Sequence, residues 1–179
     1  MVALFAAGTA SSRVAGPSGL NARCSGLSVM LLLMLMMMGL SACSSPPKPP
    51  KPTSVTGTIS AAEQLNPTAN KRPSPVVLRI YELKTAAGFG SADFMALYQG
   101  DQAAIGADMV SREEMTLRPG ETRAYQRILS VETRFIGVMA AYRDLERATW
   151  RAVVAVTPAQ DQKLTIRAGE AVLSAVIAN

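Results

Sequence analysis

The sequence predicts a mainly β protein, a two-sheet β-sandwich of about eight strands with a short added helical element. From residue 55 onward, apolar residues alternate with polar ones or form short runs, which is typical of strands. Turn residues separate these runs at the spacing expected of a sandwich. A single stretch around residues 91–98 has helical spacing instead.

The predicted strands are short, and turn residues bound each of them. The clearest is residues 75–83, in which Val76, Leu78 and Ile80 share one face. Residues 134–142 are almost continuously apolar, which predicts a central position in a sheet. The other predicted strands are residues 55–61, 109–117, 122–129, 149–156, 162–167 and 171–178.

Two connections between these strands have recognisable turn chemistry. Arg118-Pro119-Gly120-Glu121 places proline and glycine where a type II turn requires them. Gly169 supplies a turn between the last two strands, which predicts that they form a hairpin.

The stretch with helical spacing has its own start signals. Ser91 is the expected N-cap, and Asp93 in the first turn would complement the helix dipole. Phe94, Leu97 and Tyr98 are spaced to lie on one face. We expect a short helix over an end or edge of the sandwich, followed by a further helical turn at residues 102–105.

The N-terminal part of the chain has the organisation of a secretory signal. Arg13 and Arg23 precede an apolar segment at residues 27–40, which is shorter than the roughly 20 residues that a spanning helix needs. The alternative interpretation is an uncleaved membrane anchor.

The signal ends in a motif that resembles a bacterial lipobox, Leu40-Ser41-Ala42-Cys43. The motif implies cleavage between Ala42 and Cys43 and acylation of Cys43, where three acyl chains would form a long-lived anchor. Ser44 follows the cysteine, and by resemblance to enteric lipoproteins it favours export to the outer membrane.

We therefore divide the chain into three parts: a lipoprotein signal peptide (1–42), a lipidated proline-rich tether (43–54) and a β-sandwich domain (55–179). The tether sequence SSPPKPPKPT favours polyproline II, because proline cannot donate the hydrogen bonds of helix or sheet. At about 3.1 Å per residue, this segment would hold the domain up to roughly 30 Å from the membrane.

Composition argues against an enzyme and against nucleic-acid binding. The chain has 18 basic and 13 acidic residues, and the signal removes two arginines, so the mature net charge is only +3. There is no histidine, and no metal-ligand, phosphate-binding or nucleophile motif; we expect no cofactor. Cys24 leaves with the signal and Cys43 is lipidated, so packing alone must stabilise the domain.

Three segments resemble, in order, the type VI secretion outer-membrane lipoprotein family known as TssJ or SciN. They are LNPTANKRPSPVVLRIYELK, FGSADFMALYQGD and IGVMAAYRDLERATWR. The resemblance implies a transthyretin-like β-sandwich on the periplasmic face of the outer membrane. It also implies a partner, the periplasmic C-terminal domain of the IcmF-like inner-membrane protein TssM, within the complex that docks the contractile secretion machine.

The segment that could carry function is the loop at residues 63–74, which is long for a connection between neighbouring strands. From the residues alone, an ordinary surface loop and a partner-presenting loop both stay open. The resemblance implicates this loop in TssM binding. By position, the candidate contact residues are Asn66, Pro67, Thr68, Asn70, Lys71, Arg72, Pro73 and Ser74.

Within this loop, the resemblance assigns electrostatic contacts to two basic residues. Lys71 and Arg72 would meet acidic groups of the partner, with Arg72 as the anchor because a guanidinium can pair bidentately. Thr68 and Lys71 stand where the family more often has an acid and a glycine.

Other conspicuous residues are expected to be structural. Trp150 should pack within a strand, Arg143 and Asp144 should pair to fix a turn, and Arg79 should be exposed at a sheet edge. Two other function classes stay open: a pilotin-like lipoprotein that escorts a secretin, and an envelope glycan-binding module, which would need an exposed aromatic platform.

Overall fold

The structure is a computed structural model that describes residue 30 and residues 51–178. Apart from residue 30, the predicted signal peptide lies outside these residues, and so do the lipidation site at Cys43 and most of the tether. Contacts divide the chain into residues 1–48 and 49–179, and the second unit holds all the strands that the structure describes. No helix among the described residues is long and apolar enough to cross a membrane.

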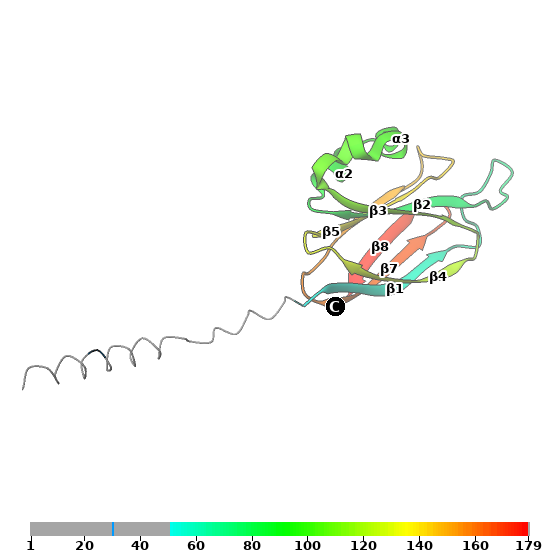
Figure 1. The fold of residues 1–179 in the computed structure, drawn as a ribbon. Coiled ribbons are helices and arrows are strands. Elements are labelled where there is room, and N and C mark those ends of the chain that lie inside the picture. The colour runs from blue at the N-terminus through cyan, green and yellow to red at the C-terminus, as the bar shows by residue number, and fades with distance from the viewer. Residues whose placement is uncertain (1–29, 31–50, 179) are drawn as a thin grey trace, which may run out of the picture. The chain divides into compact units, whose positions relative to one another are not determined.

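Eight strands form two four-stranded sheets that face each other (Figure 1). The prediction of a two-sheet sandwich is confirmed, with strand ends shifted by at most two residues. All neighbouring strands are antiparallel except β1 and β7, which run parallel. One sheet has the order β4 (Thr122–Leu129), β1 (Thr53–Ala61), β7 (Asp161–Ala168), β8 (Leu173–Ala178); the other has β3 (Met109–Leu117), β2 (Val76–Leu83), β5 (Phe135–Ala140), β6 (Arg151–Ala155).

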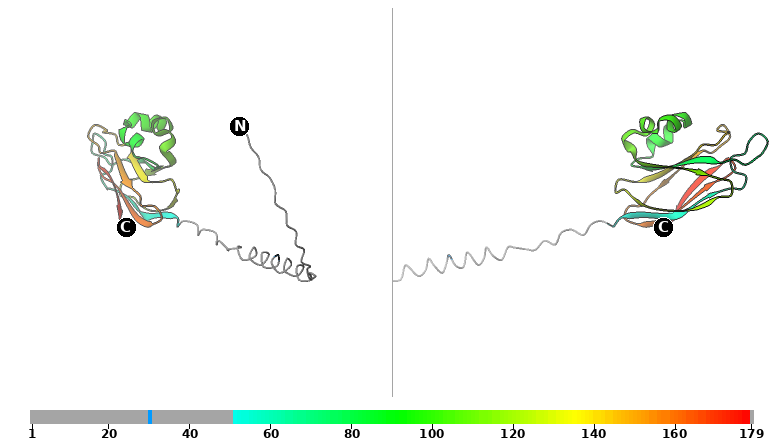
Figure 2. Two further views of the ribbon diagram at one scale, coloured as in Figure 1. Left: turned by 90° about the vertical axis from the view of Figure 1, so that its left-hand side faces the viewer. Right: turned by 45° about the vertical axis from the view of Figure 1, so that its right-hand side comes forward.

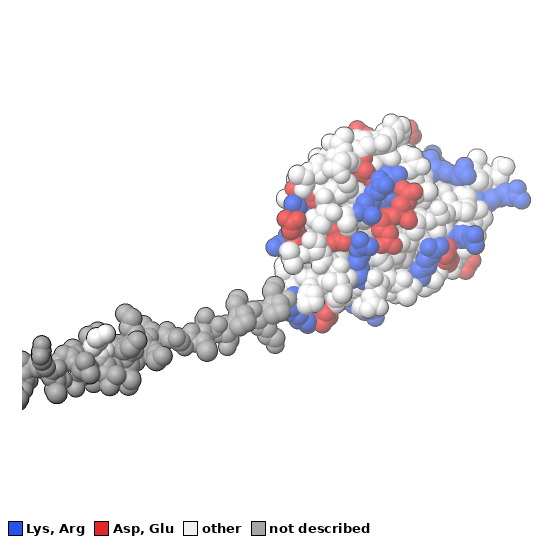
Figure 3. Space-filling view, in the orientation of Figure 1, with Lys and Arg blue, Asp and Glu red and all other residues white. Residues whose placement is uncertain are grey.

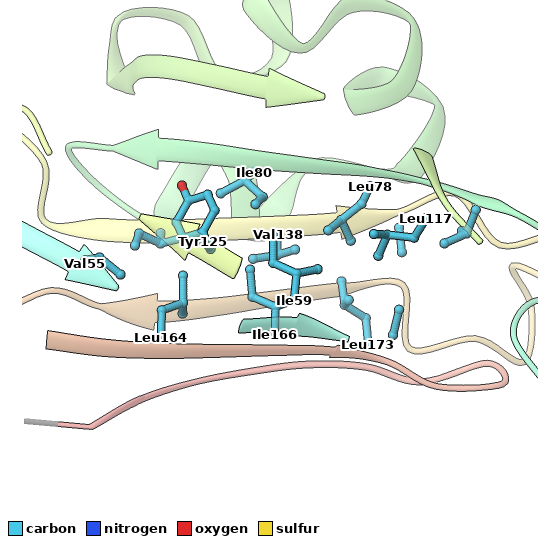
Figure 4. Close-up of a cluster of buried hydrophobic side chains, with 14 of the residues drawn as sticks. Val55, Ile59, Leu78, Ile80, Leu117, Tyr125, Val138, Leu164, Ile166 and Leu173 are labelled. Atoms are coloured by element: carbon cyan, nitrogen blue, oxygen red, sulfur yellow. The ribbon is translucent and has the colours of Figure 1, made fainter. Parts of the chain in front are cut away.

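The main core lies between the sheets, where the alternating apolar residues of each strand meet (Figure 4). Val55 and Ile59 of β1 face Leu78 and Ile80 of β2, and all four are buried. Burying each such side chain contributes about 1.5–3 kcal/mol. Gly57 allows β1 to approach β7 closely, because a Cβ at this position would lie 1.7 Å from the carbonyl oxygen of Leu164.

Two predicted local features agree with the structure. The turn at residues 118–121 closes with a hydrogen bond of 3.0 Å from the Glu121 amide to the Arg118 carbonyl, and Gly120 has the positive φ (73°) that a type II turn needs. Strands β7 and β8 form the predicted antiparallel hairpin.

Helices cover the outer face of the sheet that contains β2 (Figures 1 and 2). They are α2 (Ala87–Ser91), α3 (Phe94–Ile105) and a short 3₁₀ turn at Gly106–Asp108. They bury a second apolar cluster against this face. Its fully buried members are Tyr81, Leu83, Phe89, Leu97 and Met139.

The predicted helix cap was wrong by two residues. Ser91 ends α2, whereas the N-cap of α3 is Asp93, whose carboxylate accepts a hydrogen bond of 2.8 Å from the Ala96 amide. The Ala96 amide has no partner within the helix, and the Asp93 carboxylate three residues before it satisfies that amide. Asp93 therefore takes the N-cap position in place of Ser91. The helical turn expected at residues 102–105 is a continuation of α3 beyond a kink at Gly100.

The expectation that Arg79 is exposed at an edge was also wrong. Strand β2 lies inside its sheet, and the Arg79 side chain is held beneath α3. Its guanidinium donates to the carbonyls of Leu97 (3.1 Å) and Tyr98 (2.9 Å) and pairs with Glu114 (2.6 Å). The kink at Gly100 interrupts the helical hydrogen bonding of this turn, and Arg79 supplies donors in its place.

Trp150 packs as expected, although it precedes β6 rather than lying within a strand. Its ring meets Phe94 edge to face, with centroids 5.4 Å apart. Phe94 in turn stacks on Tyr98, and the Arg79 guanidinium lies 4.9 Å from the centre of the Tyr98 ring. These aromatic faces are therefore occupied within the domain itself.

Candidate partner-binding loop

The candidate loop joins β1 in one sheet to β2 in the other, which accounts for its length. It projects from the end of the sandwich opposite to the start of β1 (Figures 1 and 2). We call this end the loop end, and we call the opposite end, where the chain enters β1, the tether end. Basic side chains extend from the loop end in Figure 3.

Buried hydrogen bonds fix the base of the loop. Asn66 is 4% exposed; its side-chain amide donates to the Pro75 carbonyl (2.9 Å), and its Oδ1 accepts from the Arg143 amide (2.8 Å). The Asn66 amide donates to the Glu170 carbonyl (3.0 Å). The Ser74 hydroxyl donates to the Asn66 carbonyl and accepts from Nε of Arg143 (3.1 Å). The two ends of the loop are thus held to each other and to two other loops.

The pairing expected between Arg143 and Asp144 does not occur. Asp144 instead accepts from the Arg147 amide (3.4 Å) and lies 3.7 Å from the Arg147 guanidinium. Arg143 turns toward the candidate loop because Ser74 and Asn66 offer buried acceptors there. Sequence reasoning missed this link because Asn66 and Arg143 lie 77 residues apart and no local pattern connects them.

The tip of the loop is a tight turn. The Thr68 carbonyl accepts from the Lys71 amide (2.8 Å), and the Thr68 amide donates to the Arg72 carbonyl (2.9 Å). Lys71 has a φ of 58°, a left-handed conformation that favours glycine. This geometry agrees with the glycine that the resemblance implies for this position, and the lysine is accommodated there at a cost.

The candidate residues divide into two groups by exposure. Asn66 and Ser74 are buried at the base, where they brace the loop. Pro67 and Thr68 are half-buried, whereas Asn70, Lys71, Arg72 and Pro73 are exposed. Within residues 51–178, neither the Lys71 nor the Arg72 side chain forms an ion pair. The tip therefore offers two unpaired cations on a rigid support.

A cleft of about 690 Å³ lies beside the tip, which sequence reasoning did not predict. Pro67 and Thr68 form one wall, and Tyr142, Arg143 and Arg147 contribute to the rest. Burial raises the pKa of Tyr142 to about 12, and its hydroxyl donates to the Gly169 carbonyl (3.2 Å). The tyrosine in this wall therefore stays neutral at physiological pH. No group of histidine, cysteine or acidic residues in the described part of the chain could hold a metal ion.

Comparison with known proteins places this fold and loop in a family. A family model described as type VI secretion lipoprotein (VasD, EvfM, TssJ) matches residues 53–171. The crystal structure of the type VI lipoprotein TssJ1 from Pseudomonas aeruginosa is similar, with 43% identity, a TM-score of 0.69, and coverage of 72% of this chain and 98% of that one. No curated protein matches.

Two further solved structures are similar. Serratia marcescens Lip, a membrane-bound component of the type VI secretion system, has 26% identity and a TM-score of 0.65, covering 70% of this chain and 96% of its own. A chain in the structure described as the type VI protein TssM C-terminal domain (869–1107) from EAEC has 30% identity and a TM-score of 0.55, covering 68% and 99%. The chain described here belongs to the type VI secretion lipoprotein (TssJ) family.

Proposed function

We propose that this protein anchors the type VI secretion complex to the outer membrane, where it binds the periplasmic C-terminal domain of TssM through the tip of the β1–β2 loop. The observation that carries the proposal is the exposed, unpaired pair of cations at Lys71 and Arg72. Acyl chains on Cys43 would hold the other end of the molecule in the membrane.

The construction of the loop suits a binding role. Its base is fixed by the Asn66, Ser74 and Arg143 hydrogen bonds, so little conformational entropy is lost when a partner binds the tip. An Arg72 guanidinium with no competing acid can form a bidentate pair with a partner carboxylate. The half-buried Pro67 and Thr68 link the tip to the neighbouring cleft, which enlarges the available surface.

The similarity to a chain in the TssM structure from EAEC supports the choice of partner. The present chain has 179 residues, and 68% of it covers 99% of the matched chain, so the matched chain has about 120 residues. The TssM segment 869–1107 is about twice that length. The matched chain is therefore too short to be that TssM domain, and a TssJ-like chain beside a TssM domain accounts for both lengths.

The anchoring role follows from the two ends of the molecule. Three acyl chains would give stable membrane attachment, whereas one chain alone binds only marginally. Mechanical load on the partner would pass through the loop into the sandwich and from β1 into the tether. The two other function classes gain no support: the family match favours type VI secretion over a pilotin, and the aromatic rings that a glycan platform would use pack against each other.

The test is a charge reversal at the tip. Lys71→Glu with Arg72→Glu should weaken binding to the purified TssM C-terminal domain at least tenfold, measured by calorimetry, while the melting temperature stays near wild type. The charge-matched control is Lys84→Glu with Lys163→Glu, two residues near the tether end. Unchanged affinity in the tip variant, or equal loss in both variants, would reject the loop as the binding site.

A further inference from the structure

We propose that the tether end of the sandwich also contacts the lipid surface, with Ile128 and Val131 inserted among the headgroups. The proposal rests on the lipid anchor at Cys43 put forward above. It gives the domain a second, direct contact with the membrane that carries it. The orientation of the loop end would then be fixed by the sandwich as well as by the tether.

Ile128 and Val131 are the most exposed large apolar side chains of residues 51–178, at 71% and 75%. Single exposed apolar residues are ordinary on protein surfaces. These two lie three residues apart, however, and next to the point where the tether enters the domain. Ile128 of β4 stands opposite Ser54 of β1, and Val131 belongs to the turn that follows β4.

The position of the anchor puts this end close to lipid. Only nine residues separate Cys43 from Thr53, where β1 begins. The tether can therefore extend no further than roughly 30 Å, and shorter separations are available to it. The side chain of Lys51, the first tether residue that the structure describes, pairs with Asp161 at 2.7 Å beside Ser54. This pair holds the tether against the same end.

The turn that carries Val131 is rigid. The buried Glu82 carboxylate accepts from the Ser130 amide (3.0 Å) and the Thr133 hydroxyl (2.7 Å). The Arg134 guanidinium donates to the Val131 carbonyl (2.7 Å). With its backbone fixed on both sides, the turn presents the Val131 side chain to solvent with little entropic cost at the moment of contact.

Two basic residues around this surface are neutralised within the domain, whereas the Arg134 guanidinium beside Val131 forms no ion pair within residues 51–178. Lys51 pairs with Asp161, and Lys84 pairs with Glu132 at 3.3 Å. The Lys51 and Lys84 pairs therefore bring no unpaired charge toward the headgroups, and the Arg134 cation can meet their phosphate oxygens. The apolar area is too small to hold a soluble domain on a membrane, but the anchor raises the effective concentration of this surface at the bilayer.

The test uses thiol labelling of the mature, lipidated protein in vesicles of phosphatidylethanolamine with a minor share of phosphatidylglycerol. Cys43 is acylated and Cys24 leaves with the signal, so an introduced cysteine is the single free thiol. Val131→Cys should react several-fold more slowly with a membrane-impermeant maleimide on vesicles than in detergent solution. Val172→Cys is the control, because Val172 is 56% exposed and is the last residue of the β7–β8 turn at the loop end.

A fluorescent label gives an independent readout. An environment-sensitive dye on Val131→Cys should shift to the blue and be quenched by spin-labelled acyl chains, and the dye on Val172→Cys should not. Equal reactivity and emission at both positions, in protein that floats with the vesicles, would overturn the membrane contact and leave the anchor intact. Failure of the protein to float would overturn both proposals.

Discussion

The two ends of this sandwich are built in the same way but present opposite chemistry. At each end a buried polar side chain fixes a connecting segment: Asn66 braces the β1–β2 loop, and Glu82 braces the turn at residues 130–134. The loop end exposes unpaired cations at Lys71 and Arg72. The tether end pairs Lys51 and Lys84 with acids and exposes Ile128 and Val131. The sheets supply rigidity to both ends, and the connections, together with Ile128 of β4, determine what each end can bind.

The hydrogen bonds of the two bracing residues differ in their dependence on pH. Asn66 is neutral, so its hydrogen bonds persist across the pH range. Burial alone would raise the pKa of the Glu82 carboxyl, but hydrogen bonds from Thr133, Ser130, Ser111 and Arg127 outweigh it and lower the pKa below its usual range. Of the two braces, only the one at the tether end therefore depends on pH.

The largest effect on secretion should come from removing the membrane anchor while the partner-binding loop is left intact. Cys43→Ala removes the acyl chains and should abolish secretion, while the purified domain keeps its melting temperature and its affinity for the TssM C-terminal domain. The loop end would then work without an anchor to carry load. Secretion assays and calorimetry on the same variant check this expectation, and secretion at the wild-type level would contradict the anchoring role.

The bracing of the tether end should account for the greatest change in stability. Glu82→Gln leaves the Arg127 charge without its buried partner and should lower the free energy of unfolding by about 3 kcal/mol at neutral pH. Because the folded pKa of Glu82 is depressed, its contribution is full above the unfolded value of about 4 and is lost as the pH falls below it. The stabilities of both proteins, measured by urea unfolding, should thus converge in acid.

The control for this variant is Glu113→Gln. Glu113 also pairs with Arg127, at 3.1 Å, but its side chain is 38% exposed, so the expected loss is below about 1 kcal/mol. A gap between wild type and Glu82→Gln that stays constant down to strongly acidic pH would show that the Glu82 charge does not support the tether end.

Loss of the Asn66 brace at the loop end should lower stability somewhat less than loss of the Glu82 brace at the tether end. Asn66→Ala removes two buried hydrogen bonds and places alanine at a φ of 45°, which together should cost about 2 kcal/mol of stability. Affinity for TssM should fall too, although Asn66 is buried, because the tip loses its preorganisation. Asn70→Ala in the exposed tip is the matched control for stability. Chemical denaturation and calorimetry would measure both quantities, and equal stability of the two variants would refute the bracing role.

The smallest effect should come from a change in the tip itself, where the stability of the fold and the affinity for TssM should change in opposite directions. Lys71→Gly relieves the left-handed backbone and should raise stability by about 0.5 kcal/mol, after the entropic cost of glycine is subtracted. The same change removes a cation, so affinity for TssM should fall. Arg72→Gly, at a residue outside the left-handed region, should lower both stability and affinity. A change in stability of the same sign in both variants would contradict the assignment of backbone strain to position 71.

Much of the fold could be predicted because strand periodicity is a local property of the sequence. Alternation at residues 75–83 and the continuous apolar run at 134–142 identified β2 and β5 and the central position of β5. The burial and contacts of Arg79 could not be predicted in this way, because they depend on the order of the strands and on the helix that covers β2. The N-cap of α3 could not be predicted with certainty from the sequence, because Ser91 and Asp93 are both favourable N-cap residues and the structure uses Asp93.

The candidate site was predictable in part for the same reason. The length of the loop and its basic dipeptide are visible in the sequence, whereas the link from Asn66 to Arg143 joins segments 77 residues apart. A further signal was present: the resemblance implies glycine at position 71, which indicates a left-handed residue, and the structure places Lys71 in that conformation. The exposed apolar pair at the tether end carries no sequence signal, because Ile128 continues a strand pattern.

Hydrogen–deuterium exchange of the lipidated protein on vesicles, with and without the TssM C-terminal domain, would compare the two ends in one experiment. We predict that the partner slows exchange at residues 67–73 and leaves residues 129–134 unchanged. Protection by TssM at residues 129–134, with the β1–β2 loop unaffected, would contradict the assignment of partner binding to the loop end.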